Sequence, residues 1–224
     1  MRLQISISLA FLFLLCCRPV PLHISPLPSK IEYIEGYASL RVSASGESSR
    51  SKFAFLFHLP HQAHIDVSDI LGRTIYQIIM NKTNAFLVVP SKKVYWQGSE
   101  EEIIERLLGF RLSLGEIIGL LTGKWHEASQ EEKELNGWVL KKDKKGRIKR
   151  GQRGGLTFEV VEFIEDTPFA YTLIFKQQLN EGRLKILKIG LNRPVKKEAF
   201  MTDFLKHFEQ KQWAEIQELL EHED

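Results

Sequence analysis

The stretch KFAFLFHLPHQAHIDVSDILGRTIYQIIM, residues 52–80, decides the fold because it holds three strand-like segments separated by turn signals. The segments are Lys52–Leu59, Ala63–Val67 and Thr74–Met80, and Pro60 and the dipeptide Leu71-Gly72 separate them. Short strands that follow one another at this spacing are typical of an antiparallel meander. This stretch therefore predicts three neighbouring strands of one antiparallel sheet.

The sequence outside this stretch extends the sheet and adds helices. Serine N-caps followed by apolar residues at helical spacing predict two short helices over residues 99–109 and 113–123, the second with a capping box of Ser113 and Glu116. A longer amphipathic helix is predicted in the C-terminal segment, residues 196–224. The other predicted strands are Gly36–Ala44, Ala85–Val89, Lys93–Trp96, Trp138–Lys142, Arg147–Arg150, Leu156–Ile164, Tyr171–Gln177 and Leu184–Leu191, which makes about eleven in all.

Several predicted strands are apolar on both faces. Phe53, Phe55 and Phe57 alternate on one face of their strand, while Ala54 and Leu56 occupy the other. An antiparallel sheet with one face in water would alternate apolar and polar residues instead. Two interpretations remain open: a thick core covered by the helices, or a strongly curved sheet that encloses an apolar cavity for a ligand.

The first seventeen residues, MRLQISISLAFLFLLCC, are typical of an export signal. Ile5–Leu15 is apolar, and it is too short to cross a bilayer of ~30 Å as a helix. The run ends at Cys16-Cys17 and resembles a bacterial lipobox, which predicts a signal peptide over residues 1–16 and acylation of Cys17. Plain secretion and an uncleaved anchor are the alternatives. The proline-rich residues 17–31 are predicted to form a tether.

Composition limits the classes of protein that the chain could represent. Removing 16 of the 224 residues leaves 208, which suffices for one domain with a substantial core. Both cysteines lie in the first seventeen residues, so no disulfide is expected in the body. The net charge of +3 does not indicate nucleic acid as a partner. The basic residues 141–153 predict a solvated hairpin tip or, alternatively, a patch for anionic lipid headgroups.

Motifs for catalysis or metal binding do not stand out in the sequence. Nucleophile motifs, phosphate-binding loops and metalloprotease helices are absent from it. His58, His61 and His64 lie three residues apart around a predicted turn, with Asp66 on the same strand as His64. Exposed hairpin histidines explain this pattern better than a zinc or copper site does. The sequence therefore predicts a protein that is not an enzyme and has neither a metal nor a cofactor.

Three parts of the sequence resemble the LolB family of outer-membrane lipoprotein receptors, in the LolA/LolB-like superfamily. These parts are residues 34–40 (IEGYASL), residues 53–57 with 65–78 (FAFLF and IDVSDILGRTIYQI), and residues 108–114 (LGFRLSL) continuing through 117–123. The resemblance rests on the order of these segments and covers roughly residues 34–191. It implies a fold that is mainly β with α, in which residues 32–195 form an incomplete antiparallel β-barrel of about eleven strands. Short helices would lie at the barrel mouth, followed by the C-terminal helix.

The resemblance also implies site residues. Leu71, beside Ile70, matches the family's protruding leucine on a strand-connecting loop, which inserts into the membrane. The barrel would enclose acyl chains of lipoproteins in an apolar cavity. The residues expected to line it are Phe53, Phe55, Phe57, Ile75, Phe86, Leu114, Ile118, Tyr171, Leu173 and Phe175.

The function implied by the resemblance is lipoprotein delivery. An outer-membrane protein anchored through Cys17 and facing the periplasm would take acylated lipoproteins from a periplasmic LolA-like carrier and release them into membrane lipid. Two other functions stay open: a related carrier for a lipid or glycolipid, and a structural lipoprotein that binds protein partners. The sequence departs from the family in lacking room for a helix before the first strand and in its long C-terminal segment.

Overall fold

The computed structural model describes residues 22–24, 26–44, 47–69, 71–82, 84–124 and 137–221. Its strands are β1 (Tyr33–Ala44), β2 (Glu47–His58), β3 (Gln62–Ser68), β4 (Thr74–Asn81), β5 (Asn84–Val89), β6 (Val94–Gly98), β7 (Val139–Lys142), β8 (Ile148–Arg153), β9 (Leu156–Phe163), β10 (Ala170–Gln177), β11 (Asn180–Leu191) and β12 (Glu209–Gln210). The α-helices are α2 (Glu100–Leu108), α3 (Leu114–Thr122) and α4 (Trp213–Glu221), and the 3₁₀ turns are η1 (Pro90–Lys92), η3 (Lys197–Phe200) and η4 (Asp203–His207).

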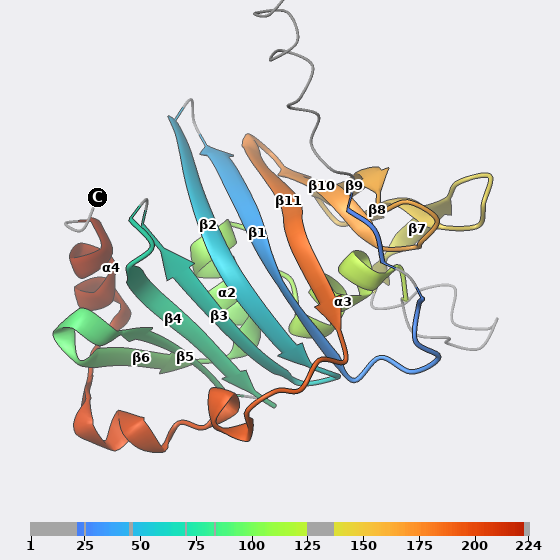
Figure 1. The fold of residues 1–224 in the computed structure, drawn as a ribbon. Coiled ribbons are helices and arrows are strands. Elements are labelled where there is room, and N and C mark those ends of the chain that lie inside the picture. The colour runs from blue at the N-terminus through green and yellow to red at the C-terminus, as the bar shows by residue number, and fades with distance from the viewer. Residues whose placement is uncertain are drawn as a thin grey trace, which may run out of the picture.

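All twelve strands belong to one strongly curved sheet (Figure 1). The order is β12-β6-β5-β4-β3-β2-β1-β11-β10-β9-β8-β7, and the two edge strands β12 and β7 do not pair with each other. The sheet is therefore an incomplete barrel, as predicted. Its strand pairs are antiparallel except for β12, which lies parallel to β6.

Helices α2 and α3 cover the concave face of the sheet and complete the core. Ile103 and Ile104 of α2, and Leu114 and Leu121 of α3, are buried against strand residues such as Phe55. Both helices begin as the sequence predicts: Ser99 caps α2, and the capping box that opens α3 is present. No helix in the described ranges is long and apolar enough to cross a membrane.

The prediction of one long helix in the C-terminal segment, residues 196–224, is wrong. The chain makes the turns η3 and η4, adds β12 to the edge of β6, and only then forms the nine-residue helix α4. The backbone N–H of Glu209 donates to Lys93 O at 2.9 Å, and that of Lys211 donates to Tyr95 O at 2.8 Å. An open sheet edge offers unpaired backbone groups of this kind, and pairing with them replaces the hydrogen bonds of the predicted amphipathic helix.

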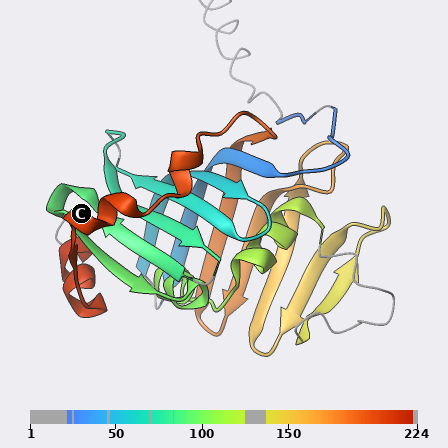
Figure 2. The same cartoon turned by 90° about the horizontal axis from the view of Figure 1, so that it is seen from below.

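The same segment explains why some strands are apolar on both faces. Ile79 and Val88 are fully buried on the convex face, away from the main core cluster. The turn η3 contacts β3 and β4 on this side, and Phe200 lies 6.0 Å from the ring of His58. Figure 2 shows the segment running across the strands before it reaches α4. Both sides of the sheet are thus covered, one by α2 and α3 and the other in part by the C-terminal segment.

Candidate binding cavity

A cavity of about 1050 Å³ lies between the concave face of the sheet and the helices. Its wall is built by residues of β1 to β4, β10 and β11 on the sheet side and of α2 and α3 on the helix side. Leu220 of α4 also reaches it. The apolar residues of the wall include Leu40, Val42, Phe53, Phe55, Phe57, Ile65, Val67, Ile75, Ile78, Met80, Ile103, Ile104, Leu107, Leu108, Phe110, Leu114, Ile117, Leu121, Phe175, Leu184, Ile186 and Leu220.

Charged residues mark the end at which the cavity opens. Arg50, Lys52, Asp69 and Arg73 are the charged members of the described wall. In the strand register they lie at one end of the sheet, where the β1–β2, β3–β4 and β10–β11 hairpins turn. We call this end the rim. Away from the rim the wall is mainly apolar, and the exposed residues of the wall lie at the rim.

Leu71 protrudes at the tip of the β3–β4 hairpin, on the rim. Its side chain is 75 % exposed although it is a large apolar residue. The turn is fixed by Asp69, whose carboxylate accepts from the N–H of Leu71 at 2.8 Å and from that of Arg73 at 2.9 Å. Gly72 completes the turn at φ +80, a left-handed conformation that glycine adopts without strain. The hairpin therefore holds Leu71 out into solvent, next to the cavity mouth.

The predicted site residues fall into three groups. The cavity wall contains Phe53, Phe55, Phe57, Ile75, Leu114 and Phe175. Ile118 and Leu173 belong to the packed core instead, and Tyr171 is partly buried against it. Phe86 contacts Tyr95 on the other face of the sheet, with ring centroids 6.2 Å apart. Cys17 and Ile70 lie outside the described residues.

Sequence reasoning missed the contribution of α2 and α4 to the wall. Ile103, Ile104, Leu107 and Leu108 of α2 all reach the cavity, as does Leu220. The apolar stripe of α2 was visible in the sequence, but a stripe at helical spacing does not say whether it meets packed side chains or an open space. The position of Leu220 depends on Trp213, which packs edge-on against Trp96 with Arg106 over both rings.

A buried glutamate fixes α3 against the sheet. Glu116 accepts from Trp138 Nε1 at 2.6 Å and from the Ser113 backbone N–H at 2.8 Å, and it forms an ion pair with Arg153. Its side chain is only 7 % exposed. Burial of a charge is tolerated when it is paired and hydrogen-bonded in this way. The network therefore holds the helix whose Leu114, Ile117 and Leu121 form part of the cavity wall.

The three histidines of the sequence analysis have separate surroundings. His58 stacks on Tyr33 with ring centroids 4.4 Å apart, and His61 is exposed at the β2–β3 turn. His64 contacts Asp66 through Nε2 at 3.1 Å and the carbonyl of Ala199 through Nδ1 at 2.6 Å. Within the described residues there is no group of three or more acidic, histidine or cysteine side chains placed to hold a metal ion.

His64 forms a pH-dependent link between β3 and the C-terminal segment. Burial lowers the pKa of His64, but hydrogen bonds to Asp66 and to Ala199 O outweigh it and raise the pKa above its usual value. The hydrogen bond from His64, opposed by burial, lowers the pKa of Asp66. Both ring nitrogens face acceptors, so the doubly protonated imidazolium fits the site.

We expect this link to stabilise the protein in acid solution relative to neutral solution. A raised histidine pKa contributes stability that is complete below the unfolded pKa of ~6.5 and is lost as pH rises through the folded pKa. The free energy of unfolding of the native chain should exceed that of His64→Gln by about 1 to 2 kcal/mol near pH 6, and by less near pH 8. Denaturant titrations at the two pH values check this. An equal difference at both would contradict the assignment of a charged His64.

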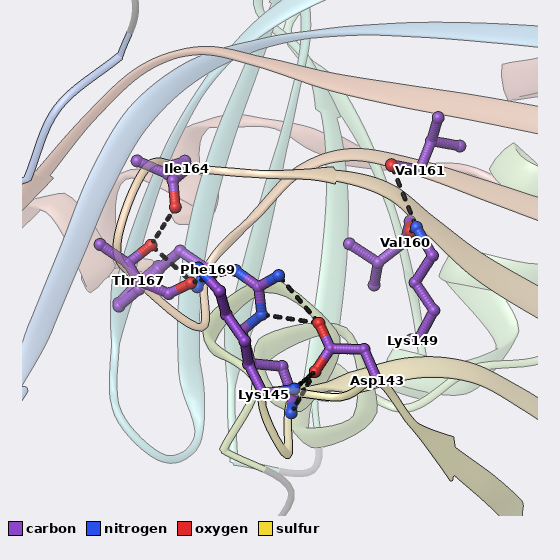
Figure 3. A network of polar contacts seen from close by, with 9 residues as sticks. Asp143, Lys145, Lys149, Val160, Val161, Ile164, Thr167 and Phe169 are labelled. Carbon is purple, nitrogen blue, oxygen red and sulfur yellow. Dashed lines mark hydrogen bonds and ion pairs between the residues drawn. The ribbon is translucent and has the colours of Figure 1, made fainter.

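Four of the eight basic residues in 141–153, namely Arg147, Lys149, Arg150 and Arg153, bind groups within the protein, and the other four are exposed lysines. Figure 3 shows Asp143 at the β7–β8 turn, where it accepts from Arg147 Nε at 2.9 Å, and Lys149 reaching the carbonyl oxygens of Val160 and Val161. Arg150 pairs with Glu159 at 2.9 Å. The hairpin tip lies at the end of the strands opposite the rim. These contacts favour the predicted hairpin tip over the predicted lipid patch.

Comparisons with known proteins identify the fold. No protein-family model matches the sequence, and no curated protein matches it. A solved LolA superfamily protein from Nitrosomonas europaea superposes with a TM-score of 0.56 at 13% identity, covering 79% of this chain and 93% of that one. A domain from Vibrio parahaemolyticus named as a putative outer membrane lipoprotein-sorting protein gives 0.56 at 11% identity, with 80% and 93% covered. A DUF1329 family protein from Desulfovibrio piger gives 0.52 at 9% identity, with 79% and 92% covered. The chain therefore shares its fold with these three proteins.

Proposed function

We propose that this protein binds the acyl chains of lipoproteins in its cavity and delivers the lipoproteins to the outer membrane. The observation that carries the proposal is the apolar cavity of about 1050 Å³, which opens at the rim beside the exposed Leu71. This volume slightly exceeds the range of ~300–1,000 Å³ that is usual for ligand pockets. An apolar chain fits such a wall better than a polar metabolite does.

The proposed mechanism is transfer by relative affinity and needs no covalent step. Each methylene that leaves water for the cavity gains ~0.8 kcal/mol, and the bilayer interior offers it about the same. Binding in the cavity is therefore close in free energy to insertion in a membrane, and the excess of lipid drives release. We accordingly propose a role that is not enzymatic.

The remaining parts of the proposal concern place and partners. Acylation of Cys17 would anchor the chain to the outer membrane, facing the periplasm, and a LolA-like carrier would supply the lipoproteins. The names of two fold neighbours, a LolA superfamily protein and a lipoprotein-sorting domain, are consistent with this role. A carrier of another lipid or glycolipid is the second candidate, because the same apolar wall would accept its chains. The side chains of the protein leave this cavity open, which speaks against a purely structural lipoprotein.

Acyl binding can be tested with a charge placed in the wall. Ile117 of α3 is half-buried and lines the cavity, so Ile117→Glu would put a carboxylate where the acyl chain lies. Because the apolar contact of one such side chain contributes roughly 1.5 to 3 kcal/mol, we expect the affinity for a fluorescent fatty-acid probe to fall at least tenfold. Fluorescence titration of the full chain in both forms measures the change.

The matched control is Ile174→Glu. Ile174 is also a half-buried isoleucine, but it lies on the convex face of β10 and outside the cavity wall. Probe affinity should be unchanged in this variant. If the native chain does not bind the probe, or if both variants lose the same affinity, the proposed function is wrong.

A further inference from the structure

Three arginines form a row across the centre of the sheet. In the strand register Arg41 of β1 lies directly opposite Arg50 of β2 on one side and directly opposite Arg183 of β11 on the other. Residues paired in this way point to the same face, here the convex one, because Leu40 and Leu184 beside them line the cavity on the concave face. Arg50 and Lys52 also border the cavity, at the rim where its wall ends. Strands lie ~4.8 Å apart, so the row is about 10 Å wide. Lys52 and Lys185 lie opposite Ser39 and extend the row on the same face.

The row lacks compensating charge within the described protein. Arg41 donates to Ser48 Oγ at 2.8 Å and Arg50 to Ser39 Oγ at 3.2 Å, both neutral acceptors. Arg183 has no hydrogen-bond or ion-pair partner among the described residues. Glu181 is the carboxylate next to Arg183 on this face, and it pairs with Lys176 at 2.9 Å. Like charges directly opposite one another destabilise a sheet, so an anionic partner outside the chain would relieve this arrangement.

Exposed leucines flank the row on both sides. Leu71 lies at the tip of the β3–β4 hairpin, and Leu179 lies at the tip of the β10–β11 hairpin, at the same rim of the sheet. They are 75 % and 82 % exposed, the two most exposed large apolar side chains of the described protein. Between the two hairpins lie β2 and β1, which carry Arg50 and Arg41, and Arg183 lies on β11 of the second hairpin. Arg183 follows Leu179 by four residues, or about 13 Å along the strand.

We propose that the row of Arg41, Arg50 and Arg183 binds the anionic headgroups of a lipid bilayer, while Leu71 and Leu179 on either side enter its acyl region. A bilayer that accepts Leu179 brings its headgroups within reach of the long arginine side chains. Docking in this orientation turns the cavity mouth toward the membrane. The inference deepens the proposed function, on which it rests, by naming the membrane contact that delivery would use. Because the row is positively charged, the lipids that it would bind are anionic.

The test measures binding of the full chain to vesicles. Every sample carries Cys17→Ser, so that no acyl group on that residue contributes to membrane binding. Binding is measured by flotation with phosphatidylcholine vesicles that contain or lack phosphatidylglycerol. Each cation near an anionic surface contributes about a factor of five in affinity, so the triple variant Arg41→Gln, Arg50→Gln, Arg183→Gln should bind anionic vesicles roughly a hundredfold more weakly. Its binding to neutral vesicles should not change. Added salt should weaken the native chain on anionic vesicles only.

Two further variants separate docking from folding and from general charge. The triple variant Lys142→Gln, Lys144→Gln, Lys145→Gln removes the same charge from exposed positions at the β7–β8 hairpin, opposite the rim, and should bind as the native chain does. The arginine-to-lysine triple variant keeps the charge of the row and should retain most of the binding. Leu179→Glu should weaken binding to neutral and anionic vesicles alike. The unfolding midpoint of the arginine-to-glutamine variant should be unchanged or higher, because repulsion within the row is removed.

Equal vesicle binding by the arginine-to-glutamine variant and the native chain would overturn the inference and leave an acidic protein as the partner of the row. The inference would also be wrong if the Lys142, Lys144 and Lys145 control lost as much binding to anionic vesicles, because net charge alone would then explain the binding. Fatty-acid probe binding measured on the same samples tests the proposed function separately. Failure of the native chain to bind the probe would refute acyl carriage without changing the vesicle comparison.

Discussion

Replacing Leu71 by glutamate is expected to slow the delivery of an acylated lipoprotein to liposomes strongly while leaving acyl binding intact. The Leu71 side chain protrudes from a turn fixed by Asp69, and its burial in lipid would gain at most ~1.5 to 3 kcal/mol. A carboxylate at this tip opposes contact with the bilayer interior, so the transfer rate should fall by one to two orders of magnitude. Transfer of a fluorescently labelled lipoprotein from the full chain to liposomes measures this rate.

Met201→Glu is the matched control for this experiment. Met201 is an exposed apolar residue at 49 %, but it follows η3 near His58, at the end of the sheet opposite the rim. Delivery should be unchanged in this variant. If Leu71→Glu delivers as fast as the native chain, the exposed tip has no part in membrane contact, and a carrier that does not touch the membrane becomes the better account.

Glu116→Ala is expected to cause the largest loss of stability of any single substitution considered. It removes the carboxylate from Arg153 and from the indole N–H of Trp138, and it deletes half of the capping box of α3. Breaking a buried ion pair by removing one partner costs about 3 to 5 kcal/mol. The melting temperature should fall by roughly 6 to 20 °C in a protein of this size. Differential scanning calorimetry of the full chain provides the measurement.

Glu101→Ala provides the comparison for Glu116→Ala. Glu101 also pairs with an arginine, Arg111 at 3.2 Å, yet its side chain is 48 % exposed. Exposed ion pairs contribute about 0 to 1 kcal/mol, so the melting temperature should change little. A similar fall in melting temperature in the two variants would mean that burial of Glu116 is not the reason for its contribution to stability.

The sheet and the two short helices could be predicted from the sequence because local signals there agree with the tertiary structure. Turn residues such as Pro60 and Gly72 separate alternating apolar segments, and Ser99 and Ser113 cap the helices where expected. The C-terminal segment could not be predicted in this way. The spacing of Phe200, Phe204 and Phe208 indicates a helix, but hydrogen bonds to the distant edge of β6 determine the backbone there.

The candidate site was predicted in part for a similar reason. A strand fixes which face a side chain occupies, so Phe53, Phe55 and Phe57 of β2 could be assigned to one wall, and they are found on it. Phe86 lies on the other face, because the faces of separate strands are related only through the register. The arginine row was likewise hidden from the sequence. Arg41, Arg50 and Arg183 lie in different parts of the chain, and pairing of β1 with β2 and β11 brings them together.

The most direct test of the account is to find where an acyl chain binds. A fatty acid with a photoactivatable group in its tail would be crosslinked to the full chain, and the labelled peptides would be identified by mass spectrometry. We predict labels on the wall of the cavity, in β2 at Phe53 to Phe57 and in the α2 and α3 segments that carry Leu107 and Ile117. Labels confined to the convex face, or spread over exposed residues such as Met201, would contradict the account.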